Sequence, residues 1–188
     1  MSGRSRRERS RGQAMVEFAL ILPLFLILLM GMLEFGIVFD HRNAMAYAVR
    51  EGARVGASLG NGGSQSSGVD PAILAAVQRG LTDPILIENI TSIEIFKADL
   101  AGLPVTGKID KYDRAGTLIG TAGWPATSRV PPGLVSGATG DSIGVRVTYA
   151  FRPQTPLGTI LGLFVNGDPP YTTIPMTDRY VVKLEPAP

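Results

Sequence analysis

Residues 12–40 read GQAMVEFALILPLFLILLMGMLEFGIVFD. No charged side chain occurs from Phe18 to Leu33, a run of 16 residues, and the apolar segment continues across Glu34 to Phe39, which makes 22 residues. As an α-helix, this segment would span about 33 Å, close to the ~30 Å thickness of a bilayer core. Pro23 removes one backbone hydrogen bond and should kink the helix, which membranes tolerate. The sequence therefore predicts a membrane-spanning helix.

The basic character of the chain is confined to the residues before this span. Residues 1–12 hold five arginines and one glutamate, a net charge of +4, whereas residues 13–188 hold 13 basic and 15 acidic groups, a net charge of −2. Arginines ahead of the span predict a cytoplasmic N-terminus and an exported remainder. A faintly acidic remainder argues against a nucleic-acid-binding domain, so we expect membrane lipid and no nucleic acid among the partners. The absence of cysteine excludes disulfides and thiol nucleophiles.

Two other interpretations of the apolar segment were weighed. A secretory signal peptide also has a basic start, an apolar run and an A-x-A site, and such sites lie at residues 44–46 and 46–48. Against it, the run is long, and three charged residues separate it from these sites: Glu34, Asp40 and Arg42. A buried core helix would not need an arginine-rich leader. A retained, single-pass membrane helix is the interpretation that we favour.

Gly12 ends the basic leader, and cleavage after it would make Gln13 the new N-terminus. Gln13 and Glu17 are four residues apart and share one face of a helix. The new amine, with a pKa of about 7.7–8.0, would be mostly protonated at neutral pH and could pair with Glu17 in the same or a neighbouring chain. A carboxylate near lipid is costly and usually has a partner. A solvated Glu17 at the headgroup level is the equally weighted alternative.

Four motifs in this order resemble the TadE-like family: GQAMVEF at 12–18, LILP at 20–23, LEFG at 33–36 and REGAR at 50–54. Members of this family are minor pilins, or pseudopilins, of the tight-adherence (Flp-type) pilus machinery. The resemblance is dense over residues 11–58 and looser beyond. One departure is Gln13, where major type IV pilins commonly carry an aromatic residue or methionine after the cleaved bond.

The resemblance implies several properties of the chain. A prepilin peptidase would cleave after Gly12, with Glu17 as the charge recognised during processing or assembly. The apolar helix would be retained in the cell (inner) membrane, with the C-terminal domain outside. The partners would be the peptidase, other pilin subunits and the pilus assembly platform, and the role would be to assemble or prime a type IV-like pilus.

The helical pattern continues beyond the span, so we expect one helix over residues 13–60. Small residues recur on one face every four positions: Ala44, Ala48, Gly52 and Gly56. Such a stripe lets backbones approach closely, and either a neighbouring pilin helix or, as we favour, the protein's own sheet could occupy it. Glu34, Arg50 and Arg54 are candidate contacts to a partner or to the membrane, with a plain solvated face as the alternative for the two arginines.

A Gly- and Ser-rich linker over 61–69 should connect this helix to an exported domain over 70–188. We expect a short amphipathic helix from Asp70 to Gly80 and strands over 85–97, 142–152 and 179–185, the last with Tyr180, Val182 and Leu184 inward. The segment 155–164 reads as a helix that touches lipid, a partner or the sheet, and 98–140 is turn-rich and unassigned. The predicted fold class is α+β: a long transmembrane helix that extends into a small antiparallel sheet domain with short helices, as in pilins.

Nothing in the sequence favours catalysis, a cofactor or a metal. Residues 140–144 read GDSIG, which formally fits the G-x-S-x-G of hydrolases, but a strand begins at this serine where the motif needs a helix after it. His41, the single histidine, precedes the serine and is better explained as an interfacial residue at the membrane exit. Asp110 and Asp113 lie among basic neighbours, so charge compensation is expected there.

The sequence therefore indicates two alternative functions. The first is a TadE-like minor pilin of tight-adherence pilus assembly. The second is a membrane-tethered or secreted envelope binding or adhesion protein that never enters a filament.

Overall fold

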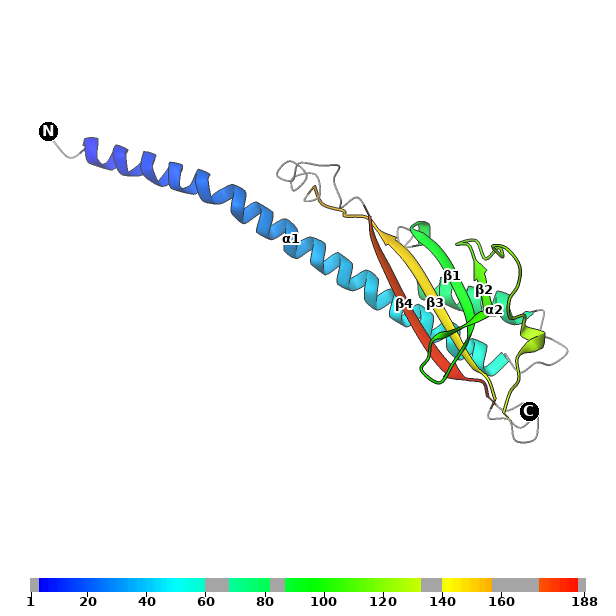
Figure 1. Cartoon of the computed structure of the whole chain (residues 1–188). Helices are drawn as coiled ribbons and strands as arrows, with labels where there is room; N and C mark the ends of the chain where they lie inside the picture. The colour runs from blue at the N-terminus through cyan, green and yellow to red at the C-terminus, as the bar shows by residue number, and fades with distance from the viewer. Residues whose placement is uncertain (1–3, 60–67, 82–86, 133–139, 157–172, 186–188) are drawn as a thin grey trace. The chain divides into compact units, whose positions relative to one another are not determined.

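The computed structural model describes residues 4–59, 68–81, 87–132, 140–156 and 173–185. The elements are α1 (Arg4–Leu59), α2 (Val69–Gly80), β1 (Ile90–Ala98), β2 (Pro104–Tyr112), a short 3₁₀ helix η2 (Ala126–Ser128), β3 (Ser142–Phe151) and β4 (Ile174–Lys183). The four strands form one antiparallel sheet in the order β2-β1-β3-β4 (Figure 1). The predicted fold class is confirmed: a long N-terminal helix, a small antiparallel sheet and a short helix.

The chain divides into two compact units. The first contains residues 1–38 and 153–172, and the second contains residues 39–152 and 173–188. Helix α1 runs through the boundary, so its apolar half belongs to the first unit and its C-terminal half to the second. Pro23 lies inside the helix without ending it.

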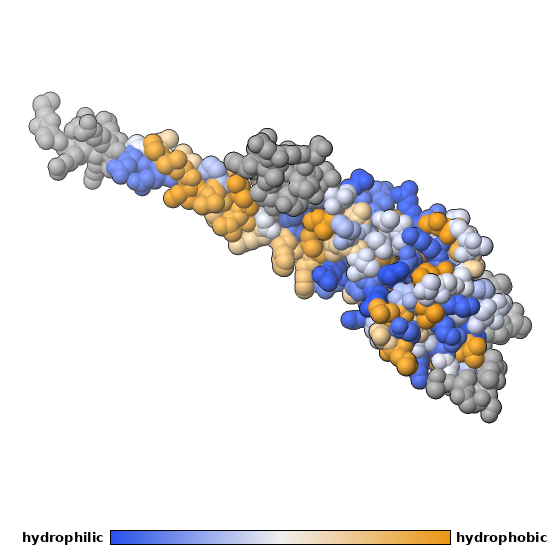
Figure 2. Space-filling view, in the orientation of Figure 1, coloured by the Kyte–Doolittle hydropathy of each residue, from blue (hydrophilic) through white to orange (hydrophobic). Residues whose placement is uncertain are grey.

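The apolar half of α1 meets the length and composition of a membrane span. Within the described residues it is the one helix that does so, and none of its most apolar 18-residue stretch is buried. Figure 2 shows this surface as the hydrophobic stretch of α1. The large exposed side chains include Leu20, Ile21, Leu24, Phe25, Leu28, Leu29, Met32, Leu33 and Phe35. Since apolar surface on this scale is unfavourable in water, the apolar half of α1 is suited to lipid and is long enough to cross a membrane once.

The core of the second unit lies between one face of the sheet and two helices, α2 and the C-terminal half of α1. Strand β3 alternates as predicted, with every second residue from Ile143 to Phe151 buried. In β1, Ile93 and Ile95 are also fully buried. From the helices, the core receives Met45, Val49, Ile73, Leu74 and Val77.

The small residues of α1 pack inside this unit. A Cβ added at Gly52 would lie 2.5 Å from a methyl of Val77, and one at Gly56 would lie 2.8 Å from Ile143 Cδ1. A Cβ at Gly80 of α2 would lie 2.7 Å from Ala48 Cα, so the two helices cross closely there. Ala48, Gly52 and Gly56 are buried and Ala44 is half-buried. Helix α2 and strand β3 thus occupy the stripe within this chain.

Three expectations about the domain differ from the structure. Strand β2 lies in the turn-rich segment 98–140, where the sequence predicts no strand, because its glycine and lysines hide a strand that is defined by its pairing with β1. Strand β4 starts at Ile174, five residues before the predicted start, because it pairs with β3 along its whole length. Tyr180 pairs with Val145 on the face of the sheet that packs against α1, as predicted, but its side chain remains 42% exposed because β4 is an edge strand. Residues 61–67 of the linker and 157–164 of the later segment lie outside the described residues, and Val69, expected in the linker, is the first residue of α2.

Candidate functional site

The expected processing segment lies on an exposed turn of α1. Gly12 has nothing within 4 Å of the position of a Cβ. The side-chain amide of the next residue, Gln13, donates a hydrogen bond of 3.0 Å to Oε1 of Glu17, which lies one helical turn further along α1. The i,i+4 spacing therefore brings these two side chains together on one face, as their separation requires. A new amine at Gln13 would lie on the same turn as the Glu17 carboxylate.

Glu34 interrupts the apolar surface of the same helix, and its side chain is buried, at 8% exposure. Its carboxylate accepts hydrogen bonds from two backbone N–H groups, that of Gln154 (2.9 Å to Oε1) and that of Thr155 (2.9 Å to Oε2). The Thr155 hydroxyl donates a third hydrogen bond, 2.6 Å to Oε2. No sequence pattern pairs Glu34 with this segment, which lies 120 residues away. Gln154 and Thr155 were not among the candidate residues.

The two candidate arginines of α1 have separate partners. Arg54 forms a bidentate ion pair with Glu51, in which Nε lies 2.9 Å from Oε2 and Nη2 lies 2.7 Å from Oε1. The hydrogen bond from Arg54 lowers the pKa of the exposed Glu51 carboxyl. The Arg50 guanidinium lies 5.8 Å from the centre of the Tyr180 ring on β4, a cation–π distance. Both arginines remain exposed to solvent.

A buried ionic network joins α2, β2 and the residues around η2, and sequence reasoning missed it. Arg129 has a fully buried side chain, with Nη2 at 2.6 Å from Asp70 Oδ1 and 3.8 Å from Asp110 Oδ2. Its guanidinium lies 4.9 Å from the Trp124 ring centre. Asp110 also accepts hydrogen bonds from the backbone N–H groups of Gly123 and Trp124, at 2.6 and 2.9 Å. Asp110 is therefore compensated by a distant arginine, and not by the adjacent lysines that the sequence suggested.

Tyr112 extends this network on β2. Its hydroxyl donates a hydrogen bond of 2.9 Å to Asp70 Oδ2. Burial raises the pKa of the Tyr112 phenol, and the neighbouring Asp70 carboxylate raises it further, because both disfavour a phenolate. Each of these groups packs within the second unit, so the network is a structural feature of that unit.

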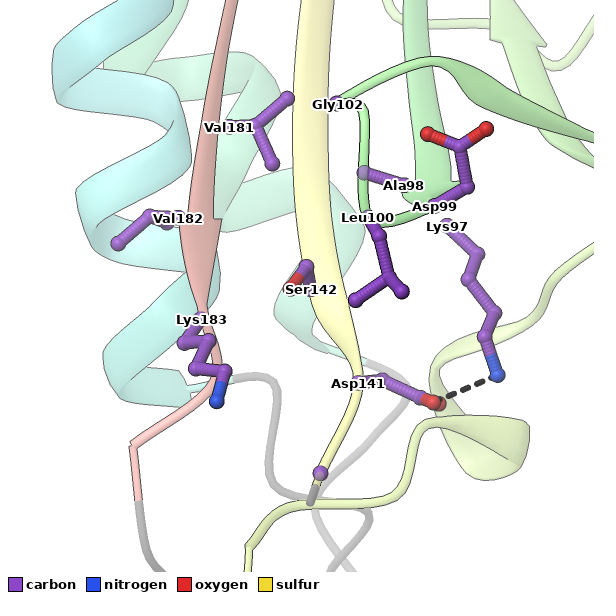
Figure 3. Close-up of a pocket in the computed structure, with 11 residues that line it drawn as sticks. Lys97, Ala98, Asp99, Leu100, Gly102, Asp141, Ser142, Val181, Val182 and Lys183 are labelled. Atoms are coloured by element: carbon purple, nitrogen blue, oxygen red, sulfur yellow. Dashed lines mark ion pairs between the residues drawn. The ribbon is translucent and has the colours of Figure 1, made fainter.

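The G-x-S-x-G match lies beside a pocket of about 580 Å³ at one end of the sheet (Figure 3). Ser142 is the first residue of β3, and Asp141 beside it forms an ion pair with Lys97 at 2.6 Å. His41 is 3% exposed and lies 3.1 Å, through Nδ1, from the hydroxyl of Tyr149. Tyr149 is seven residues from Ser142 along β3, which is about 23 Å. The single histidine therefore cannot act on this serine.

The burial of His41 corrects its predicted place at the membrane interface. Its ring packs edge-on against Tyr149 and Phe151, with centroid distances of 5.7 Å to each. The neighbours Asp40 and Arg42 are exposed, so the helix turns His41 alone of the three into the core. Among the residues that the structure describes, no three His, Asp or Glu side chains gather as a metal site.

The N-terminal helix is the part of the chain that matches a known protein family. A family model described as TadE-like protein matches residues 12–54. The chain carries a TadE-like segment. This segment begins at Gly12 and contains Glu17, Glu34 and both arginines, so the resemblance expected from the motifs is confirmed. The match covers the greater part of α1 and none of the strands. Comparisons with curated proteins and with solved structures gave no match.

Proposed function

We propose that this chain is a minor pilin or pseudopilin that takes part in assembling a tight-adherence, type IV-like pilus. The observation that carries the proposal is the position of the TadE-like segment, which starts at Gly12, the last residue of the basic leader. The same segment contains the exposed apolar surface of α1. A retained apolar helix is what a pilin-like subunit needs, both as a membrane anchor and as a surface for other subunits.

In this proposal, residues 1–12 are a leader that a prepilin peptidase removes. Residues 13–60 form the membrane-spanning and extended helix, 61–69 a linker, and 70–188 the exported domain. The arginines of the leader keep the N-terminus in the cytoplasm, so the domain faces outward from the inner membrane. The other proposed partners are pilin subunits and the assembly platform. Because the small-residue stripe is occupied within the chain, we propose the exposed faces of α1 for these contacts.

The test is the N-terminus of the protein purified from membranes of its native cell, by intact mass and N-terminal sequencing. Cleavage after Gly12 predicts a chain that starts at Gln13 and lacks the five leader arginines. A strain without its prepilin peptidase should retain Met1. A chain that starts at Met1 in both strains would be a plain anchor, and one that starts at Tyr47 or Val49 would be a signal-peptide product; either result overturns the proposal.

A matched pair of variants makes this test specific to the bond. Gly12→Leu places a bulky side chain at the proposed cleavage site and should block processing. Gly31→Leu introduces the same side chain on the same helix, and no atom lies within 4 Å of the Cβ position at either glycine. The control should be processed as the wild type is. Equal processing of both variants would show that Gly12 is not recognised.

A further inference from the structure

Glu34 is a carboxylate in the part of α1 that should lie in or beside the bilayer core. It follows Phe18, the start of the charge-free run, by 16 residues, and at 1.5 Å per residue it lies about 24 Å along a helix that must cross ~30 Å. An ionisable side chain at that depth is costly unless it has partners. Its three hydrogen bonds from Gln154 and Thr155 meet this requirement within the chain.

The segment that supplies these donors is built to bind a carboxylate. Residues 153–156 read PQTP and directly follow Arg152 at the end of β3. Proline has no backbone N–H, so the only two N–H groups of this segment belong to Gln154 and Thr155. Both donate to Glu34, one to each carboxylate oxygen. The prolines also restrict the backbone torsions, which reduces the entropy lost when the segment binds.

We propose that Glu34 is a positioning residue that clamps the PQTP segment to the membrane helix. The contact lies wholly within the first unit, since both Glu34 and residues 153–156 belong to it. It fixes the connection that leads out of β3 at a defined turn of α1. The Glu34 carboxylate thus serves its own chain, and contacts with other subunits fall to other residues of the helix. This inference does not depend on cleavage after Gly12.

The clamp is tested by amide hydrogen exchange of the full chain in lipid nanodiscs, resolved at residues 154 and 155. Hydrogen bonds to a charged acceptor should slow exchange at both amides in the wild type. Glu34→Ala should accelerate it roughly ten- to a hundredfold. Glu17→Ala is the matched control, because Glu17 is a glutamate on the same helix that is exposed and bonded to Gln13. It should leave both amides unchanged.

Two milder variants distinguish a clamp from a general loss of structure. Glu34→Gln keeps one acceptor oxygen where two N–H groups need separate oxygens, so one amide should lose protection. Thr155→Val removes the hydroxyl donor, and Thr155→Ser restores it, so exchange at Thr155 should rise in the first and return in the second. In every variant, unchanged exchange at Val145 and Val147 of β3 shows that the sheet is intact.

The proposal is overturned by either of two results. One is equal exchange at residues 154 and 155 in the wild type and Glu34→Ala. The other is an equal acceleration in the Glu17→Ala control. If Glu34→Ala alters the sheet as well, the Glu34→Gln and Thr155 variants decide, and exchange at the wild-type rate in those variants would also refute the clamp.

Discussion

Replacing Arg129 by methionine should destabilise the second unit severely. Arg129 is the cation between two carboxylates, and its side chain is fully buried, as is that of Asp110. Methionine preserves much of the side-chain volume but leaves Asp70 and Asp110 without a counter-charge. Removing one partner of a buried ion pair costs about 3–5 kcal/mol, because the remaining charge is neither solvated nor paired. The variant also loses the contact of the guanidinium with the Trp124 ring, worth up to about 2 kcal/mol when desolvated.

Two features of the site place the expected loss toward the lower end of this range. Asp110 keeps its hydrogen bonds from the Gly123 and Trp124 N–H groups, and the Asp70 side chain is 15% exposed and partly solvated. A loss of about 3 kcal/mol is still a large share of the 5–15 kcal/mol that holds a typical domain folded. In urea it should lower the unfolding midpoint by roughly 1–3 M, given a typical dependence of 1–3 kcal/mol per molar.

The assay is urea unfolding of the full chain in detergent micelles, followed by tryptophan fluorescence. The chain has one tryptophan, and Trp124 lies within the network, so the signal reports on this site. Arg54→Met is the matched control, because it removes an exposed guanidinium that pairs with Glu51. Its midpoint should not move. The triple variant Asp70→Asn, Asp110→Asn and Arg129→Met should recover part of the loss, since it leaves no buried charge. An Arg129→Met midpoint equal to that of the wild type would refute the reasoning.

Three further predictions follow from the same structure. Glu17→Ala should leave membrane insertion intact, measured by fractionation, and impair pilus formation, measured by shearing; normal piliation would refute its proposed role. Gly144→Ala should cost about 1–3 kcal/mol of unfolding free energy, because its Cβ would overlap the Phe96 ring, whereas Gly68→Ala, which meets nothing within 4 Å, should be neutral. The raised pKa of Tyr112 means that the folded domain keeps a proton that unfolded tyrosine loses near pH 10, so stability should fall above pH 10. Tyr112→Phe should flatten that slope in unfolding midpoints between pH 9 and 11, and an unchanged slope would assign it to other groups.

The parts of the fold that the sequence predicted are those in which local pattern and tertiary environment agree. The apolar run of α1 needs no partner to be recognised, since its length alone matches a bilayer. In β3, alternation placed the five large buried side chains from Ile143 to Phe151 correctly, because one face of an antiparallel strand meets the core. Strand β2 has no such alternation. It is an edge strand, where lysines and a glycine are tolerated, and only its pairing with β1 defines it as a strand.

Spacing along the chain accounts only for those polar contacts whose partners are close in sequence. Gln13 with Glu17 and Glu51 with Arg54 lie within one helical turn, where spacing fixes proximity. The partners of Glu34, Asp110 and His41 lie on other segments, and no spacing rule reaches them.

The sequence by itself determined the general organisation of this chain: a basic N-terminal segment, an apolar helix long enough to span a membrane, TadE-like motifs and an α+β fold. These follow from charge order, hydropathy and periodicity, which are properties of consecutive residues. Only the tertiary structure decided what the interior charges do. It placed Arg129 between two aspartates, turned His41 into the core and brought the PQTP segment to Glu34. A buried charge is costly unless it is paired, and its partner is set by which residues the fold brings close in space and not by their separation along the chain.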